Sequence, residues 1–154
     1  MNVPGEIALK IDTDGVWYYY DQPLERLGLV RLFYSVLQKT TTGFALITPV
    51  EKVPVWVEDV PFAVKDIQRD DSGTITLLLN DETLLPLTSE LRLRQNMHNI
   101  LYVSVLERNG HTFEARFTRN AYFAIAACFQ ELPDGAYVLR SGDAEFLLKT
   151  HLED

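Results

Sequence analysis

The side chains best suited to chemistry gather between residues 51 and 59, in the stretch EKVPVWVED. Glu51 and Lys52 begin this stretch, and Glu58 and Asp59 end it. Two carboxylates can share general acid and base work only when both face one substrate. Neighbouring residues of a strand point to opposite faces of the sheet, so Glu58 and Asp59 do not form such a pair by themselves. The pattern therefore favours a binding surface over a catalytic pair.

Two further side chains, Trp56 and Arg26, require a neighbouring group, because an indole on the outer face of a strand needs cover and a buried guanidinium needs an acceptor. The alternating valines of residues 53–57 mark the buried face of a strand, which leaves Trp56 to be covered by another element of the chain or by a ligand. Arg26 falls in the middle of the apolar side of a predicted helix. A buried guanidinium that loses its partner costs about 3–5 kcal/mol. We therefore predict that Arg26 contacts a carboxylate or a carbonyl of the 51–59 hairpin, although its stem is long enough to reach solvent.

Sequence motifs for metals, phosphates and nucleotides are missing. The aspartates between residues 12 and 21 imitate a calcium loop, but Lys10 and Asp21 stand where that loop needs its first and last ligands. The three histidines are too widely spaced for a zinc motif, and the single cysteine, Cys128, has no identifiable base. Glycine-rich phosphate loops and the G-x-S-x-G nucleophile motif do not occur. We expect neither a metal nor a cofactor.

Composition narrows the class of protein further. The chain has 154 residues, 47% of them hydrophobic and 23% charged, which is typical of a folded globular protein. Its net charge of −8, with an acidic excess in both halves, argues against nucleic acid and anionic membranes as partners. The longest membrane-like run, residues 121–129, is far shorter than the ~20 residues of a transmembrane helix. A single cysteine favours a reducing compartment, so we expect a cytoplasmic protein.

The elements that position these residues are predicted to be mainly hairpins, with one helix in each half. Alternating apolar residues mark the strands, and Gly-containing pairs mark the turns between them. A capping residue or a proline precedes each run of helix-forming residues. The predicted helices are residues 23–39 and, with Thr118 as its cap, 119–131. The predicted hairpins are residues 7–20, 44–59, 62–80, 100–117 and 136–150.

This order of elements predicts a duplication. A hairpin, a helix and a hairpin occur in each half at nearly constant offsets, so that Val30 should superpose on Ile125 and Tyr34 on Phe129. We therefore expect an α+β fold of two similar subdomains, each with an antiparallel sheet packed on a helix. Residues 1–80 would form the first and residues 81–154 the second, packed together because no flexible tether separates them.

Several short motifs occur in both halves of the chain. In the first half they are Asp14-Gly15-x-Trp17-Tyr18, Arg26, Leu29-Val30-Arg31-Leu32-Phe33, Thr48-Pro49-Val50-Glu51-Lys52 and Val57-Glu58-Asp59-x-Pro61-Phe62. In the second half they are Asn80-Asp81, Leu91-Arg92, Glu114-Ala115-Arg116, Arg119 and Tyr122. Together these motifs resemble a bacterial family, the domain of unknown function 1285. The resemblance implies a two-part α+β protein with repeated motifs and a suggested role in ligand binding or signal transduction. It supplies no reaction, and the motif residues serve either the fold or a site.

The leading hypothesis is a non-enzymatic cytoplasmic module that recognises a small molecule or a protein segment at the junction of the two halves. Its expected ligand-binding residues are Arg26, Glu51, Lys52, Trp56, Glu58, Asp59, Arg116 and Arg119. One alternative is a hydrolase or transferase whose acid and base residues, Glu58, Asp59 or Glu114 with Arg116, are brought together only in the fold. Another is an oligomeric interaction protein.

The second predicted helix motivates the oligomeric alternative. Residues 121–129 leave it almost no polar side, and Phe123 and Ala127 lie away from the face that bears Tyr122 and Ile125. We expect that side to be covered by the first helix or the central hairpin of the same chain, or by a second copy in a homodimer.

Overall fold

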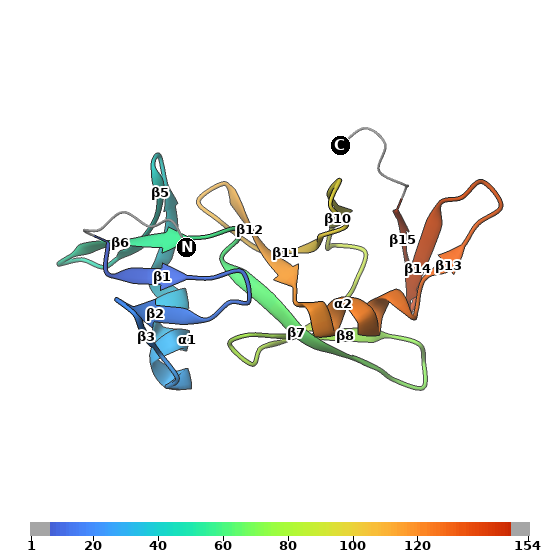
Figure 1. Cartoon of the computed structure of the whole chain (residues 1–154). Helices are drawn as coiled ribbons and strands as arrows, with labels where there is room; N and C mark the ends of the chain where they lie inside the picture. The colour runs from blue at the N-terminus through green and yellow to red at the C-terminus, as the bar shows by residue number, and fades with distance from the viewer. Residues whose placement is uncertain (1–6, 149–154) are drawn as a thin grey trace.

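Residues 7–148 are described by the computed structural model, and they form two helices, two six-stranded sheets and one three-stranded sheet (Figure 1). The fold is richer in strands than the expected α+β arrangement, because each six-stranded sheet recruits short strands from segments that lack a strong alternating pattern. Examples are β3 (Gln22–Pro23) and β9 (Leu84–Pro86), which occupy sheet edges.

The first sheet is built from the N-terminal part of the chain in the order β3-β2-β1-β6-β5-β4. The central strands β1 and β6 are parallel, and their neighbours are antiparallel. A helix, α1, carries the chain from one edge of the sheet to the other. Besides β3, the elements are β1 (Leu9–Ile11), β2 (Trp17–Tyr19), α1 (Leu27–Val36), β4 (Leu37–Thr40), β5 (Gly43–Ile47) and β6 (Lys52–Val57).

The second sheet repeats this topology in the order β10-β11-β12-β7-β8-β9. Its first and last strands, β7 and β12, again pair in parallel at the centre. The crossing between the two edges is made by the segment 87–92 instead of a helix. Besides β9, the strands are β7 (Phe62–Arg69), β8 (Ile75–Leu79), β10 (Leu93–Gln95), β11 (Leu101–Arg108) and β12 (His111–Phe117).

The remaining elements follow the second sheet. In Figure 1, α2 leads away from β12 to a small separate sheet of order β13-β14-β15. The elements are α2 (Arg119–Ala126), β13 (Gln130–Glu131), β14 (Tyr137–Ser141) and β15 (Ala144–Leu148).

The predicted duplication is wrong in its boundaries. The strands after α1 rejoin the sheet of the hairpin before it, whereas those after α2 form a sheet of their own. Val30 and Ile125 therefore do not hold equivalent places, since α1 crosses within its sheet and α2 leaves the second sheet. The expected domain boundary after residue 80 falls inside the second sheet, between β8 and β9. The units that repeat are residues 9–57 and 62–117.

The five predicted hairpins are confirmed within the described residues, but both helices are shorter than predicted. α1 ends at Val36 because Leu37 turns extended and pairs with Leu46 of β5. Arg108 of β11 caps the end of α1, with Nη1 donating to the carbonyls of Tyr34 (2.8 Å) and Leu37 (2.6 Å). α2 begins at its predicted cap, Thr118, and ends at Ala126. The part of the last hairpin beyond residue 148 lies outside the described residues.

The two large sheets share one hydrophobic core, with α1 at their junction. Tyr34 of α1 stacks on Phe62 of β7 at 4.1 Å between ring centroids and meets Trp17 of β2 edge-on at 5.1 Å. Its hydroxyl donates to the carbonyl of Pro61 (2.6 Å). Burial raises the pKa of Tyr34, an effect that the hydrogen bond from the Asn80 amide opposes. The two large sheets are therefore packed directly against each other.

The side of α2 that bears Phe123 is not covered by another part of the described chain. Phe123 is 62% exposed, so neither the first helix nor the central hairpin covers it. Cover by a second copy of the chain stays a prediction.

Candidate functional site

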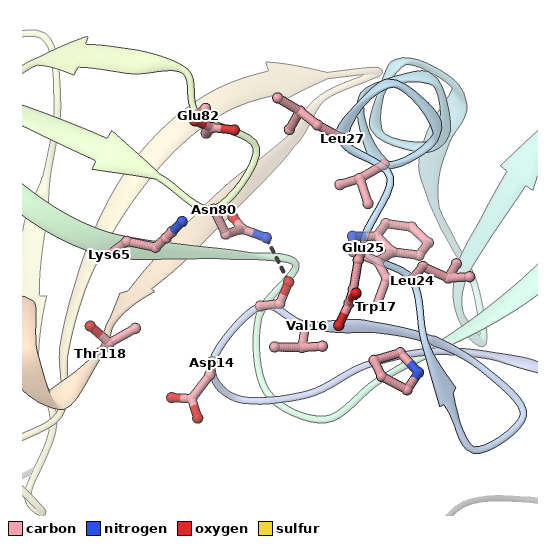
Figure 2. Close-up of a pocket in the computed structure, with 13 residues that line it drawn as sticks. Asp14, Val16, Trp17, Leu24, Glu25, Leu27, Lys65, Asn80, Glu82 and Thr118 are labelled. Atoms are coloured by element: carbon pink, nitrogen blue, oxygen red, sulfur yellow. Dashed lines mark hydrogen bonds between the residues drawn. The ribbon is translucent and has the colours of Figure 1, made fainter.

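A large cavity lies between the two six-stranded sheets. Its volume is about 590 Å³, and its wall on one side is apolar: Val16, Trp17, Leu24, Leu27 and Val30. The second sheet contributes Lys65, Asn80 and Glu82, and Thr118 precedes α2 (Figure 2). The volume is in the range of small-molecule sites, which are commonly apolar with a few polar groups.

Asn80 joins the two sheets beside this cavity. Its Nδ2 donates to the carbonyl of Gly15 (2.7 Å) and is 2.7 Å from the hydroxyl of Tyr34, while its Oδ1 accepts from the backbone of Ala63 (3.0 Å). All the hydrogen-bonding atoms of the amide are thus used within the protein. Asn80 holds the β1–β2 turn against the second sheet.

The β1–β2 turn requires Gly15 for two reasons. Its φ of +80° is costly for residues with a Cβ. A Cβ at this position would also lie 2.7 Å from Asn80 Nδ2 and 2.8 Å from the Cβ of Ala63. Asp12 closes the turn, since its Oδ1 accepts from the backbone N–H groups of Asp14 and Val16 (2.9 Å each). Asp14 is thereby fixed at the mouth of the cavity.

The charged groups that line the cavity are mainly acidic. Asp14, Glu25 and Glu82 supply three carboxylates, and Lys65 supplies the only ammonium among the described lining residues. All four side chains belong to exposed residues. The deeper wall includes the buried Trp17, whose Nε1 has no hydrogen-bond acceptor within residues 7–148. The cavity thus combines an apolar wall with an acidic rim.

A second cavity of about 260 Å³ adjoins the first, because Asp14 and Thr118 line both. Its charges are mainly basic, with the guanidiniums of Arg116 and Arg119 beside Asp14. Thr118 is the N-cap of α2, where its Oγ1 accepts from the backbone N–H of Ala121 (3.3 Å). The positive end of a short helix therefore faces the same space as the two arginines.

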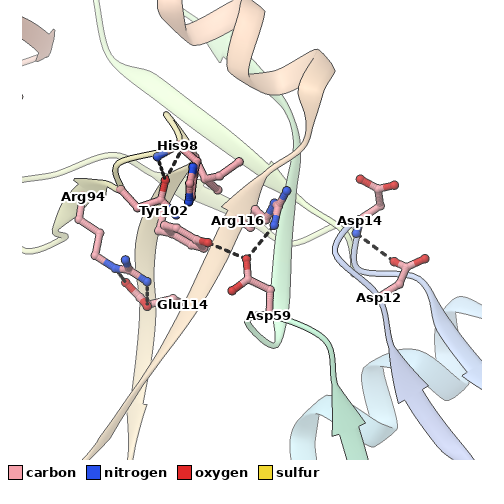
Figure 3. Close-up of polar contacts among 10 residues, drawn as sticks. Asp12, Asp14, Asp59, Arg94, His98, Tyr102, Glu114 and Arg116 are labelled. Atoms are coloured by element: carbon pink, nitrogen blue, oxygen red, sulfur yellow. Dashed lines mark hydrogen bonds and ion pairs between the residues drawn. The ribbon is translucent and has the colours of Figure 1, made fainter. Parts of the chain in front are cut away.

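A cluster of polar side chains borders the second cavity (Figure 3). Asp59 accepts from the hydroxyl of Tyr102 (2.6 Å) and from Nη1 of Arg116 (2.9 Å). Arg94 forms two hydrogen bonds to Glu114 (2.7 and 2.9 Å) and stacks over Tyr102, with 4.0 Å from Cζ to the ring centroid. Burial, followed by the hydrogen bond to Asp59, raises the pKa of Tyr102 to about 12. The cluster anchors the segment between the two sheets to the second sheet.

Three of the residues expected at the site lie together. Asp59 pairs with Arg116, and Arg116 and Arg119 line the second cavity. In Figure 3, Arg116 lies between Asp59 and the turn that carries Asp14. Their role in ligand binding stays a prediction.

The predicted contact of Arg26 is wrong. The residue is exposed, and within residues 7–148 its side chain forms no hydrogen bond or ion pair. Arg26 is the N-cap of α1 with an extended backbone (φ −82°, ψ 107°), so the helical wheel that directed it inward does not apply. Its neighbours Glu25 and Leu27 line the large cavity instead.

The residues expected between positions 51 and 59 are divided between the two ends of β6. Glu51 and Lys52 are exposed at its start, and Glu58 is exposed beyond its end. Six strand residues separate the ends by roughly 20 Å at about 3.3 Å per residue. Trp56 is half-buried within β6, opposite Lys10 of β1. These residues do not form one cluster.

Sequence reasoning missed Asn80, Lys65, Glu82 and Leu27 as residues of the junction. Asn80 carried a signal, because the Asn80-Asp81 pair belongs to the motifs of the family resemblance. The others have no local pattern that separates them from ordinary surface or core positions.

Residues 7–148 contain neither a metal-type cluster nor a membrane-type helix. No group of three or more His, Cys, Asp or Glu side chains is placed to hold a metal ion in this part of the chain. Neither of its helices has the length and apolar composition needed to cross a bilayer.

Comparison with known proteins places the chain in a family. Residues 2–60 match the family model described as the N-terminal domain of DUF1285, a domain of unknown function, and the match ends between β6 and β7. A crystal structure of a DUF1285 family protein from Silicibacter pomeroyi is 30% identical, with a TM-score of 0.73, and the alignment covers 97% of this chain and 84% of that chain. A second, from Shewanella baltica, is 25% identical, with a TM-score of 0.60, and the alignment covers 79% of this chain and 92% of that chain. No curated protein matches. The chain belongs to the DUF1285 family.

Proposed function

We propose that this protein is a binding module that holds a small molecule in the cavity between its two six-stranded sheets. The observation that carries the proposal is the cavity of about 590 Å³, which has an apolar wall from the first sheet and α1 and polar groups from the second sheet. Specific small-molecule sites commonly occupy about 300–1,000 Å³ and combine these two kinds of surface.

Binding is favoured over catalysis by the arrangement of the carboxylates. Two of the carboxylates that the enzyme hypothesis names, Asp59 and Glu114, form ion pairs with Arg116 and Arg94. Neither of these two, nor the third, Glu58, lines the large cavity. A catalytic acid or base must reach the substrate within about 2.6–3.2 Å. The carboxylates of the cavity itself are exposed at its rim, where they suit charge recognition.

The position of the cavity also supports a role in signalling. A molecule held there would touch both sheets, and it would favour the relative orientation of the sheets that binds it best. A protein partner that binds the surface of both sheets could recognise such a change in their orientation. The proposal therefore includes a cytoplasmic module that reports the presence of its ligand.

The proposal can be tested by filling the cavity. Leu27→Trp places a bulky side chain into the space, whereas Leu32→Trp adds the same side chain to the same helix at a residue that is 57% exposed. Wild type and both variants are purified from the host under native conditions, and native mass spectrometry detects any compound that stays bound. A metabolite library is then screened for compounds that raise the Tm of each protein. Circular dichroism checks that each variant is folded.

We expect the wild type and Leu32→Trp to bind the same compound and Leu27→Trp to lose it. If Leu27→Trp binds as well as the wild type, the site lies elsewhere. If the wild type neither retains a compound nor responds to the library, the proposed function is wrong.

A further inference from the structure

We infer that the ligand is a small amino-carboxylate, with its ammonium group in the large cavity and its carboxylate in the adjoining small one. This inference rests on the proposed function and names its ligand class. The two cavities share Asp14 and Thr118 in their walls but have opposite charge. A ligand that spans both would need opposite charges at its two ends.

The large cavity suits the cationic end. Its lining has three carboxylates against one lysine. In Figure 2, Glu25 lies on the side formed by α1 and Trp17, across the cavity from Lys65. Within residues 7–148 neither Glu25 nor Lys65 forms an ion pair, so Glu25 is available to a ligand. An ammonium group there would balance part of the acidic rim, and its hydrocarbon part would lie on the apolar wall.

The small cavity suits the anionic end. Arg119 forms no hydrogen bond or ion pair with another residue of the 7–148 segment, and its guanidinium lies 5.8 Å from the Phe123 ring centroid. Arg116 gives only Nη1 to Asp59, which leaves its other donors for a ligand. The first turn of α2 adds backbone N–H groups that have no acceptor within the helix.

The charge balance favours a carboxylate over a phosphate. Two guanidiniums and the Asp14 carboxylate leave one net positive charge on the lining of the small cavity. A carboxylate neutralises that charge, whereas a phosphate ester carries about −1.5 to −2 at neutral pH and would leave a negative excess. Asp59 pairs with Arg116 from outside the lining of the small cavity, and its negative charge disfavours a doubly charged phosphate more strongly than a singly charged carboxylate.

A series of simple compounds tests the inference. The probes are linear amino-carboxylates from 4-aminobutyrate to 8-aminooctanoate, which vary the distance between the charges. Alkylamines and alkanoates of equal chain length carry only one charge each. Isothermal titration calorimetry with the full chain measures the affinity of each.

We expect one length of amino-carboxylate to bind at least tenfold more tightly than its amine and its alkanoate, because each charged hydrogen bond lost is worth roughly tenfold or more. Glu25→Gln should weaken binding of this probe about tenfold and leave the affinity for the alkanoate unchanged. Arg119→Gln should also weaken binding of this probe about tenfold, but it should leave the affinity for the amine unchanged. Glu131→Gln and Arg69→Gln, at exposed positions outside both cavities, are the matched controls and should have no effect.

The outcomes separate this inference from the proposed function. If an amine or alkanoate binds as tightly as every amino-carboxylate, or if Glu25→Gln and Arg119→Gln change nothing, the ligand class is wrong. The ligand class is also wrong if library compounds bind in the cavity, as judged by Leu27→Trp, and no amino-carboxylate does. If neither the library nor the series binds, both the ligand class and the binding function are wrong.

Discussion

The first hairpin turns of the two large sheets have the same local design and different surroundings. In each, an aspartate Oδ1 accepts from the backbone two and four residues later: Asp12 in the first sheet and Asp70 in the second. Gly15 and Gly73 follow with φ of +80° and +85°. A Cβ on Gly73 would meet nothing within 4 Å, whereas one on Gly15 would meet Asn80 and Ala63. The same turn is therefore packed into the junction in the first sheet, whereas in the second sheet it leaves its glycine unobstructed and meets the small sheet, where the N–H of Gly142 donates to the carbonyl of Gly73 (3.2 Å).

The way in which each sheet crosses from edge to edge differs as well. The first sheet crosses through α1, which fills the junction and forms one wall of the large cavity, and the second crosses through the segment 87–92. A helix buries a stripe of side chains, so it can form a wall. The comparison teaches that one topology, used twice, forms the large cavity where the helix and the tight turn of one copy meet the other copy.

The largest difference between the two turns should appear on substitution of their glycines. Gly15→Ala combines a strained φ with a clash, so it should lower the free energy of unfolding by roughly 2–5 kcal/mol. Gly73→Ala carries only the strain and should cost about 1 kcal/mol. Urea denaturation measures both. Equal losses in the two variants would contradict the different roles of the turns.

Removal of the Asn80 amide should produce the next largest effect. Asn80→Ala leaves the Gly15 carbonyl and the Ala63 N–H without their partner, which should cost roughly 2–3 kcal/mol. Asn120→Ala, at an exposed position of α2, should change the free energy of unfolding by less than about 0.5 kcal/mol. Urea denaturation of the two variants measures this difference. If Asn80→Ala lowers the free energy of unfolding no more than its control does, the prediction is wrong.

The anchor between the sheets should show a smaller effect and a pH dependence. Asp59→Asn should cost about 1 kcal/mol, because the carboxylate is partly exposed and the amide oxygen still accepts a hydrogen bond. The pKa of Tyr102 should fall from about 12 toward its ordinary value, although burial keeps it raised. Tyrosinate absorbance, with Tyr102→Phe as the blank, measures the pKa.

The sign of the pH dependence follows from this raised pKa. Tyr102 ionises more readily in the unfolded chain, so its contribution to stability is complete below pH 10 and declines as the pH rises toward about 12. Alkaline denaturation of Tyr102→Phe should therefore be less steep in that interval. If the stability of wild type and of Tyr102→Phe depends on pH in the same way in that interval, Tyr102 does not contribute to the alkaline loss of stability.

The smallest effect on the fold is expected at the exposed side of α2. Because Phe123 is 62% exposed, Phe123→Glu should change the free energy of unfolding by about 0.5 kcal/mol or less. Tyr34 of α1, by contrast, is buried at the junction. Sedimentation tests the homodimer prediction: a dimer held through Phe123 should dissociate in this variant with its fold intact. A wild type that sediments as a monomer at every concentration rules the dimer out.

Local patterns predicted the hairpins well because their turns are coded nearby. Asp12 and Gly15 of the first turn lie three residues apart, and Asp12 Oδ1 accepts from the backbone N–H groups of Asp14 and Val16 in the same turn. Helix ends were predicted less well. Helix propensity continues through Lys39, but pairing of Leu37 with Leu46 and the cap from Arg108 end α1 earlier. Such long-range contacts override local propensity.

The candidate site was harder to predict because it depends on contacts between distant residues. The motifs of the family resemblance contained Gly15 and Asn80, yet no local pattern states that two residues 65 positions apart touch. Arg26 shows a different limit. The helical wheel gave it an inward direction, but the residue is extended and precedes the helix. The order of elements likewise did not reveal which strands share a sheet, since pairing is a property of the whole fold.

The most direct test of the central claim uses the two tryptophans of the chain. Trp17 lines the large cavity and Trp56, in β6, does not. The indole N–H signals of the ¹⁵N-labelled protein are assigned with Trp56→Phe and followed by NMR while the compound that binds is titrated. Binding between the sheets predicts a saturable shift of the Trp17 signal with the Trp56 signal unchanged. A shift of Trp56 alone, or saturation of binding with no change at Trp17, would contradict a ligand site at the junction.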